Sequence, residues 1–400
     1  MTLTLDPEGN VTTTPGWRAG STFAGIKTYG ENKLDLGILA SDYPCVVAGT
    51  FTQNRFRSAA VEVNVAKMAN GRARAVIVNS GCANSSTGQQ GIDDANRMSE
   101  LVSARFGFDA DDVLVGSTGV IGQFLPMDLI EAGVAAIDLS RDGGPDFSRA
   151  ITTTDTHPKH GSVRFGDYVL SGCCKGAAMI HPNMATMLAY LTTDAPVDPA
   201  FLKAELLAAV QRSFNMVAID TDTSPSDTVL LFAREAAGAY AGIDATSPIA
   251  GEFREALQLM CMHLAREIAR DGEGSTRMIE ATVNGAATET EARHLARLLT
   301  TSYLLKSAIH GADPNWGRIS AIIGRSEVAF AEANVTIDLC GVRVFEKSRP
   351  TDFDPAVLSQ AMKADEVPVV VDLGEGAASA TGWGCDLTPE YVHLNADYTT

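Results

Sequence analysis

The centre of the chain carries residue types that could cut the backbone and then perform acyl chemistry. Residues 175–190 read Lys-Gly-Ala-Ala-Met-Ile-His-Pro-Asn-Met-Ala-Thr-Met-Leu-Ala-Tyr, so that a Pro-Asn turn and the small Ala185 precede Thr186. An N-terminal threonine holds a nucleophile, its hydroxyl, and a base, its α-amine, in one residue. The segment therefore predicts self-cleavage between Ala185 and Thr186. The Thr186 hydroxyl would attack the Ala185 carbonyl, and water would hydrolyse the resulting ester.

Cleavage would leave fragments of 185 and 215 residues (400 − 185 = 215). The new α-amine has a reference pKa of about 7.7–8.0, so a useful fraction is neutral at pH 7 and can take the hydroxyl proton. Thr186 could then carry an acyl group by itself. No cofactor is expected, since the sequence has no P-loop, no dinucleotide G-x-G-x-x-G and no G-x-S-x-G elbow. No metal is expected either, because the seven histidines show no ligand spacing.

Six further segments are rich in glycine, hydroxyl and charged residues. They read Asn-Ser-Gly-Cys-Ala-Asn at 79–84, Ser-Thr-Gly-Val-Ile-Gly at 117–122, Thr-Thr-Asp-Thr at 153–156, Asp-Gly-Glu-Gly-Ser-Thr-Arg at 271–277, His-Gly-Ala-Asp-Pro-Asn-Trp-Gly-Arg at 310–318 and Tyr-Val-His-Leu-Asn-Ala-Asp-Tyr-Thr-Thr at 391–400. With residues 175–190, they resemble in order the motifs of the ornithine acetyltransferase family, also called the bifunctional glutamate N-acetyltransferase family. Cys82 and Ala178 depart from it, standing where asparagine and glycine are usual.

The resemblance implies a fold of the α/β (α+β) class. It would be a layered helix–sheet–sheet–helix sandwich with a smaller C-terminal α/β unit. Strand-rich sequence follows a long helical zone near residue 285. We therefore expect a main domain at 1–285, cut into an α chain of 1–185 and a β chain from 186, and a smaller domain at 286–400 whose tail returns to the active site.

Apolar patterning predicts the elements that must position these residues. Strands are expected at 75–79, 113–116, 163–165, 168–170, 187–191, 335–344 and 367–373. Helices are expected at 127–139, 199–214, 252–270 and 289–308. The strand at 187–191 would begin just after the proposed cut.

The resemblance also assigns catalytic roles. Thr118 and Gly119 would form the oxyanion hole, and donors arranged in advance for a tetrahedral oxyanion are often the largest catalytic contribution. Lys175 would lie beside the nucleophile. Its ammonium could hold a substrate carboxylate, or by like-charge repulsion keep the Thr186 amine neutral, and both roles stay open.

The resemblance also implies which residues contact the substrate. Glu273 would bind substrate, and a carboxylate is the natural partner for the side-chain ammonium of ornithine. Asn395 and Thr400 would bring the tail to the substrate. Thr153 would also contact it, although three consecutive threonines leave a shift of one position open.

Composition narrows the class of protein. The chain has 400 residues, 45% of them hydrophobic and 20% charged, which is ordinary for a globular protein. A formal net charge of −18 argues against nucleic-acid binding, which needs a basic face. The N-terminus lacks a signal-peptide pattern, and no run of 18 apolar residues predicts a membrane span. Seven scattered cysteines suit free thiols, and we expect a cytoplasmic protein.

The leading hypothesis is a two-stage acetyltransferase. N2-acetylornithine would acetylate Thr186 and leave as ornithine, and glutamate would depart as N-acetylglutamate, as in arginine biosynthesis, with ping-pong kinetics. Acetyl-CoA could serve as a donor. The two fragments would stay together and assemble into α2β2 or larger. The alternatives are an amidohydrolase or aminopeptidase that uses water, a secondary-metabolism paralogue with altered substrate, and a binding protein without activity.

Overall fold

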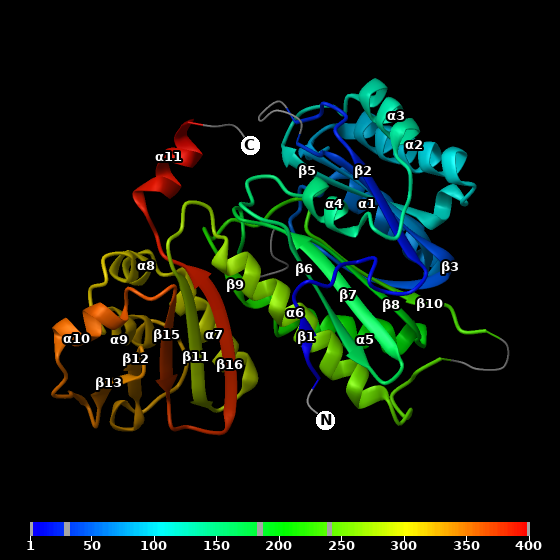
Figure 1. Ribbon diagram of the computed structural model, residues 1–400. Helices are drawn as coiled ribbons and strands as arrows, with labels where there is room; N and C mark the ends of the chain where they lie inside the picture. Colours follow the sequence, from blue (N-terminus) through cyan, green and yellow to red (C-terminus); the bar gives the residue numbers. More distant parts are fainter. Residues whose placement is uncertain (1–2, 28–32, 182–186, 238–241, 398–400) are drawn as a thin grey trace.

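The computed structural model describes residues 3–27, 33–181, 187–237 and 242–397, which form two sheets and the helices around them (Figure 1). In spatial order, the first sheet holds β1 (Leu5–Asp6), β6 (Lys159–Phe165), β7 (Tyr168–Lys175), β8 (Leu188–Pro196), β10 (Thr228–Arg234), β3 (Leu36–Phe51), β4 (Arg72–Cys82) and β5 (Val113–Val120), with β2 (Trp17–Thr22) beside β3. The second holds β14 (Arg349–Pro350), β13 (Val342–Glu346), β12 (Thr336–Leu339), β15 (Glu366–Asp372), β11 (Met278–Ala286), β16 (Ala378–Cys385) and β9 (Val217–Ala218).

The long strand β3 lets the first sheet fold onto itself. Residues 36–40 pair with β2 and β4, whereas residues 45–51 pair with β10. Side chains from the two halves of the sheet meet in one buried core, where Leu39 lies with Tyr190 and Phe232. The alternate residues of each strand face outward toward helices, as a period of two requires.

Helices cover both outer faces of the folded sheet. On the β3–β4–β5 side pack α1 (Ala59–Lys67), α2 (Gly88–Phe106) and α3 (Met127–Ala136). On the β7–β8–β10 side pack α5 (Pro199–Gln211) and α6 (Ala250–Arg270). The short α4 (Gly144–Ala150) closes the core between the halves with Phe147, whose ring lies 5.7 Å from that of Tyr190. This is the predicted helix–sheet–sheet–helix sandwich, so the expected fold class is confirmed.

The start of α5 shows how local sequence sets these helices. Asp198 caps it by accepting from the backbone N–H groups of Ala200 and Phe201, at 3.0 and 2.9 Å. Pro199 occupies the first turn, where its missing N–H costs nothing. The buried side chains Leu202, Leu206 and Val210 then recur at helical spacing and face the sheet.

The second sheet lies across α6 from the first, because α6 contacts β6 and β7 as well as β16 (Figure 1). The helices of this part are α7 (Glu289–Thr301), which packs on β11 and β16, and α8 (Tyr303–His310), α9 (Gly317–Gly324), α10 (Pro355–Ala361) and α11 (Pro389–Asp397). The division expected at residue 285 stays a prediction. The hydrogen-bonded ladder crosses it, since β9 and β11 both belong to the second sheet.

Two predicted elements are wrong in detail. The single strand expected at 335–344 is a hairpin, because Cys340 and Gly341 adopt φ angles of 51° and 76° and turn the chain between β12 and β13. The single helix expected at 289–308 is broken at Ser302, whose hydroxyl caps α8 by accepting from the N–H of Leu305 at 3.4 Å. In both places a turn or cap interrupts a continuous apolar pattern.

The core between the two halves of the first sheet predicts a test of stability. Leu230 is fully buried there, so L230A should lower the free energy of unfolding by about 2–5 kcal/mol through lost burial and the cavity left behind. The control is L207A on α5, where the side chain is 47% exposed and the change should stay within about 0.5 kcal/mol. Denaturant unfolding measures both, and equal losses would contradict the core assignment.

Candidate active site

The carboxyl ends of two parallel strands position the predicted oxyanion residues. Thr118 and Gly119 lie at the end of β5, opposite Ser80 and Gly81 of β4. Gly119 has a φ of 124°, and a Cβ built there would lie 2.3 Å from the carbonyl carbon of Gly81. Only glycine fits, so the close approach of the two strands depends on it. The end of parallel strands is a common place for a ligand site.

A pocket of about 160 Å³ opens at this edge and joins residues from distant segments. Its lining includes Thr118, Gly119, Thr153, Lys175 and Asn395. The structure thus brings five of the expected site residues together. The volume lies below the range of about 300–1,000 Å³ for drug-sized ligands and suits a molecule of amino-acid size.

The two residues of the predicted cut, Ala185 and Thr186, lie outside the described residues, as does Thr400. The chain on either side of the cut is described. Lys175 ends β7, is 5% exposed and lies opposite Leu188, the first residue of β8, in the antiparallel register. Leu188 follows Thr186 by two positions, so Lys175 lies within a few residues of the predicted nucleophile.

Glu273 connects the C-terminal tail to this site. The Asn395 side-chain amide on α11 donates to Glu273 Oε2 at 2.7 Å, and the N–H of Glu273 donates to the Ala177 carbonyl at 2.8 Å. The Thr388 hydroxyl donates to the Gly274 carbonyl at 2.6 Å, which adds a second contact from the start of the tail. Glu273 therefore lies between the tail and the segment that leads to the cut.

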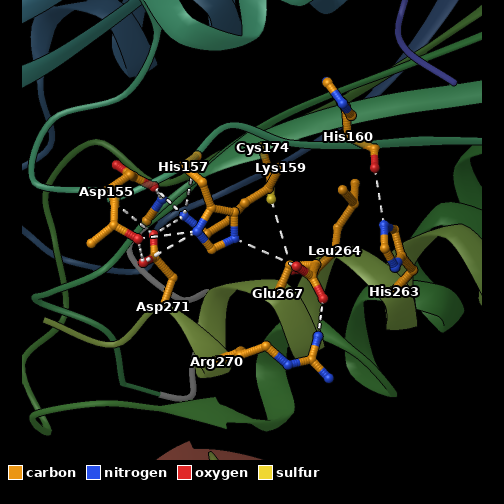
Figure 2. A network of polar contacts seen from close by, with 12 residues as sticks. Asp155, His157, Lys159, His160, Cys174, His263, Leu264, Glu267, Arg270 and Asp271 are labelled. Atoms are coloured by element: carbon orange, nitrogen blue, oxygen red, sulfur yellow. Dashed lines mark hydrogen bonds and ion pairs between the residues drawn. The ribbon is translucent and has the colours of Figure 1, made fainter. Parts of the chain in front are cut away.

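A buried ion network that the sequence analysis missed ties these segments together (Figure 2). The Lys159 ammonium lies between the carboxylates of Asp155 and Asp271, at 2.6 Å from each, and the three side chains are at most 3% exposed. Asp155 also accepts from the N–H groups of Gly176, at 2.7 Å, and Thr153, at 3.0 Å. One charged group thus orients both the Thr153 loop and the turn after Lys175.

The network stays charged despite its burial. Burial alone would raise the pKa of Asp155, but the charges of Lys159 and Lys175 outweigh it and hold that pKa well below its usual range. Burial would lower the pKa of Lys159, yet Asp155 and Asp271 together raise it. Burial lowers the pKa of Lys175, with Asp155 as the largest opposing influence.

Two further aspartates hold the backbone on both sides of residues 182–186. Asp220 accepts from the N–H groups of Met179, at 2.6 Å, and Ile180, at 2.9 Å. Asp227 accepts from the N–H of Met187 at 3.2 Å. Burial raises the pKa of Asp220, which also lines the pocket. The segment 220–227 therefore anchors both flanks of the predicted cut.

Lys27 is another charged residue that sequence reasoning missed. It is 4% exposed, and its ammonium donates to the Leu34 carbonyl at 2.8 Å. Burial lowers its pKa to about 8, with opposing influences from Asp35 and Asp155 and a further depression by Lys175. A lone lysine in a non-periodic stretch gave no signal. By contrast, Asp155 and Asp271 stand inside the segments 153–156 and 271–277, and their place in these motifs is the signal that could have identified them.

The charges of the site suit an amino-acid substrate. Lys175 lines the pocket with a cation, and Asp220 lines it with a carboxylate that can meet an ammonium group. Glu273 is not among the lining residues and is connected to them through its hydrogen bond from Asn395. Within the described part of the chain, no three His, Cys, Asp or Glu side chains gather as metal ligands. No helix of the described ranges has the length and apolar content to cross a bilayer.

Comparison with known proteins identifies the family. Residues 18–400 match the model of the ArgJ family. The chain belongs to the ArgJ family. It is 44% identical over 400 residues to the arginine biosynthesis bifunctional protein ArgJ of Dehalococcoides mccartyi, covering 98% of each chain. It is 43% identical over 390 residues to the glutamate N-acetyltransferase of Methanopyrus kandleri, covering 95% of this chain and 99% of that protein.

A solved ArgJ structure matches part of the chain. The crystal structure of the arginine biosynthesis bifunctional protein ArgJ from Bacillus halodurans is 38% identical, with a TM-score of 0.50. The match covers 98% of that chain but 52% of this one. The solved ArgJ chain is therefore about half as long as the present chain.

The ion network of this ArgJ-family site predicts a large loss of stability in K159M. Removal of the ammonium takes away the ion-pair partner that Asp155 and Asp271 share in the interior, which should cost about 3–5 kcal/mol. The control is R18M, which breaks an exposed pair with Asp42 and should cost at most about 1 kcal/mol. Denaturant unfolding compares the two, and a similar small loss in K159M would contradict the structural role of the network.

Proposed function

We propose that this chain cuts itself between Ala185 and Thr186 and then moves an acetyl group from N2-acetylornithine to glutamate through acetyl-Thr186. The products are ornithine and N-acetylglutamate, and the enzyme is a glutamate N-acetyltransferase of arginine biosynthesis. Membership of the ArgJ family supports the activity, and the names of the relatives at 43–44% identity support the pathway.

The observation that carries the mechanism is the shared pocket. Thr118 and Gly119 of β5, with Thr153, Lys175 and Asn395, come from four segments and line one cavity. The same cavity adjoins the flanks of residues 182–186, since Met179 lines it and Met187 is anchored beside it by Asp227. We expect a threonine between these flanks to lie close to the proposed oxyanion residues, the Lys175 cation and the Asp220 carboxylate.

Self-cleavage is the first step. The Thr186 hydroxyl adds to the Ala185 carbonyl carbon, the peptide C–N bond breaks, and the nitrogen takes the hydroxyl proton and becomes the free amine. Water then hydrolyses the ester, which leaves the Ala185 carboxylate and the Thr186 hydroxyl. The length of the solved relative supports such a cut, because 52% of 400 residues is about 208 (0.52 × 400), close to the 215 residues that follow Ala185.

Acetyl transfer reuses the same groups. The Thr186 amine accepts the hydroxyl proton while the oxygen attacks the acetyl carbonyl of the donor, and Thr118 and Gly119 stabilise the oxyanion. The donor C–N bond breaks, the amine proton passes to the departing ornithine nitrogen, and acetyl-Thr186 remains. The neutral amine of glutamate then attacks the ester carbonyl, and the C–O bond to Thr186 breaks. The Thr186 amine passes the proton from the glutamate nitrogen to the threonine oxygen, which restores the hydroxyl and releases N-acetylglutamate.

Substrate binding divides between charges of opposite sign. Lys175 holds the α-carboxylate of the amino acid, and Glu273 with Asn395 meets the side-chain ammonium of ornithine. Thr153 and Thr400 complete the contacts. We further propose acetyl-CoA as a second donor, which the word "bifunctional" in the names of relatives supports, and no bound cofactor. The fragments form a heterodimer that assembles into α2β2 or larger in the cytoplasm.

The competing hypothesis keeps the nucleophile but uses water as the acceptor, as an amidohydrolase or aminopeptidase would. Intact-mass analysis separates the two. Acetyl-Thr186, formed with acetylornithine, should lose its acetyl group much faster when glutamate is added than in buffer alone. Equal rates would favour the hydrolase.

Replacement of the nucleophile predicts an uncut chain. T186A should remain a single 400-residue species without transferase activity, because it lacks the attacking hydroxyl. T186S is the matched control, since it keeps a hydroxyl and should still be cut. N-terminal sequencing of the wild type should give a second sequence beginning Thr-Met-Leu, and its absence from active protein would refute self-cleavage.

Loss of one oxyanion donor predicts a slower reaction in a folded enzyme. T118A should reduce kcat by about 10²–10³-fold. The control is T152A, whose hydroxyl donates to the Arg149 carbonyl at 2.8 Å and is not among the groups that line the pocket. Steady-state kinetics at saturating substrate measure both, and a near-normal kcat in T118A would remove the assignment.

A further inference from the structure

Asp227 is a buried carboxylate to which the proposed mechanism gives no task. It immediately precedes β10 and is 1% exposed. Its Oδ1 accepts from the N–H of Met187 at 3.2 Å, and the next residue, Thr228, donates its N–H to the Met187 carbonyl at 3.0 Å. Both backbone polar groups of Met187 are thus held by residues 227–228. Met187 is covalently bonded to Thr186, so this anchor lies one residue from the nucleophile.

The charge of Asp227 acts on more than this hydrogen bond. An asparagine oxygen would accept from the Met187 N–H equally well, without the cost of burying an ion. A buried charge is retained where another charge compensates it. Lys175 supplies such a charge. It lies opposite Leu188 in the β7–β8 pair, Leu188 lies opposite Thr228 in the β8–β10 pair, and Asp227 is one of the carboxylates that favour the protonated form of Lys175. Lys175 and Asp227 therefore flank the start of β8 with opposite charges.

We propose that Asp227 is a positioning residue for the nucleophile. Its carboxylate fixes the backbone of Met187, the residue bonded to Thr186, and its negative charge favours the cationic form of Lys175, which the substrate carboxylate needs. The first half of this inference rests on the proposed role of Thr186. The second half concerns substrate binding alone and can be tested without it.

The charged groups around Lys175 determine in which direction its pKa changes when Asp227 loses its charge. Burial lowers its pKa most, Asp155 and Asp227 raise it, and Lys159 lowers it further. Lys27 and Lys175 also repel each other. Without the Asp227 charge, Asp155 and the smaller influence of Cys174 oppose burial and the two lysines. The pKa of Lys175 then falls, and carboxylate binding is lost at a lower pH than in the wild type.

The chain offers a matched control at the other end of β8. Asp194 accepts from the N–H of Val169 at 2.8 Å and so makes the same kind of carboxylate–amide bond. Six residues separate it from Leu188, which corresponds to roughly 20 Å along a strand. D194N and D194A therefore remove a comparable bond from the same strand without changing the charge beside Lys175.

Calorimetric titration with ornithine between pH 6 and 10 tests the charge. D227N keeps an acceptor for Met187, so its affinity at the acid end should match the wild type. The pH at which affinity is lost should fall by about 1–3 units, the usual effect of removing one nearby opposite charge. D194N should follow the wild type. An unchanged pH profile in D227N would overturn the charge role.

The time course of self-cleavage, followed by intact mass after synthesis, tests the anchor. D227A should be cut at least tenfold more slowly than D194A, and equal rates would overturn the positioning role. If D227A does not fold, as judged by circular dichroism, the titration of D227N alone decides the proposal.

The two experiments also separate this inference from the proposed function. A wild type that is never cut would refute Thr186 as the nucleophile but leave the titration valid. A normally cut wild type with an unshifted D227N would refute this inference only.

Discussion

One buried ammonium between two carboxylates holds the site in shape. Lys159 lies at the start of β6, Asp155 in the loop before it and Asp271 just after α6. The free-energy cost of burying each charge is several kcal/mol unless the others are in place. The arrangement is therefore close to all-or-none. Since Asp155 also binds the backbone of Thr153 and Gly176, the loops that carry the pocket residues adopt their positions together.

The position of β8 explains how a cut next to it could leave the fold intact. β8 pairs with β7 on one side and with β10 on the other, so both edges of its backbone are hydrogen-bonded. A chain end here would lie in the middle of a sheet, where local opening is costly, and not at a frayed edge. The anchors Asp220 and Asp227 hold the two flanks separately, and neither needs an intact peptide bond between residues 182 and 186.

The sequence alone predicted the elements that have a periodic apolar pattern and the residues that lie inside recognised motifs. The strand runs at 75–79 and 113–116 lie within β4 and β5, and their carboxyl ends meet as parallel strands require. Asp220 and Asp227 were missed because a lone aspartate has no periodicity. Their meaning comes from bonds to residues about 40 positions away, which only folding brings together. The hairpin at Cys340 was missed for the opposite reason, because one local turn interrupts an otherwise continuous apolar pattern.

The cations of the site, Lys175 and Lys27, belong to a chain whose formal net charge is −18. An ammonium binds a carboxylate strongly only where water is excluded, and exclusion of water is what lowers the pKa values of Lys175 and Lys27. The nearby aspartates offset that loss of charge. Lys27, with a pKa of about 8, titrates in the range of a free α-amine, about 7.7–8.0. Because Lys27 interacts with Lys175, a proton taken up by either lysine disfavours the protonation of cationic groups nearby. If the chain is cut as proposed, a protonated Lys175 would disfavour protonation of the new Thr186 amine, because like charges repel.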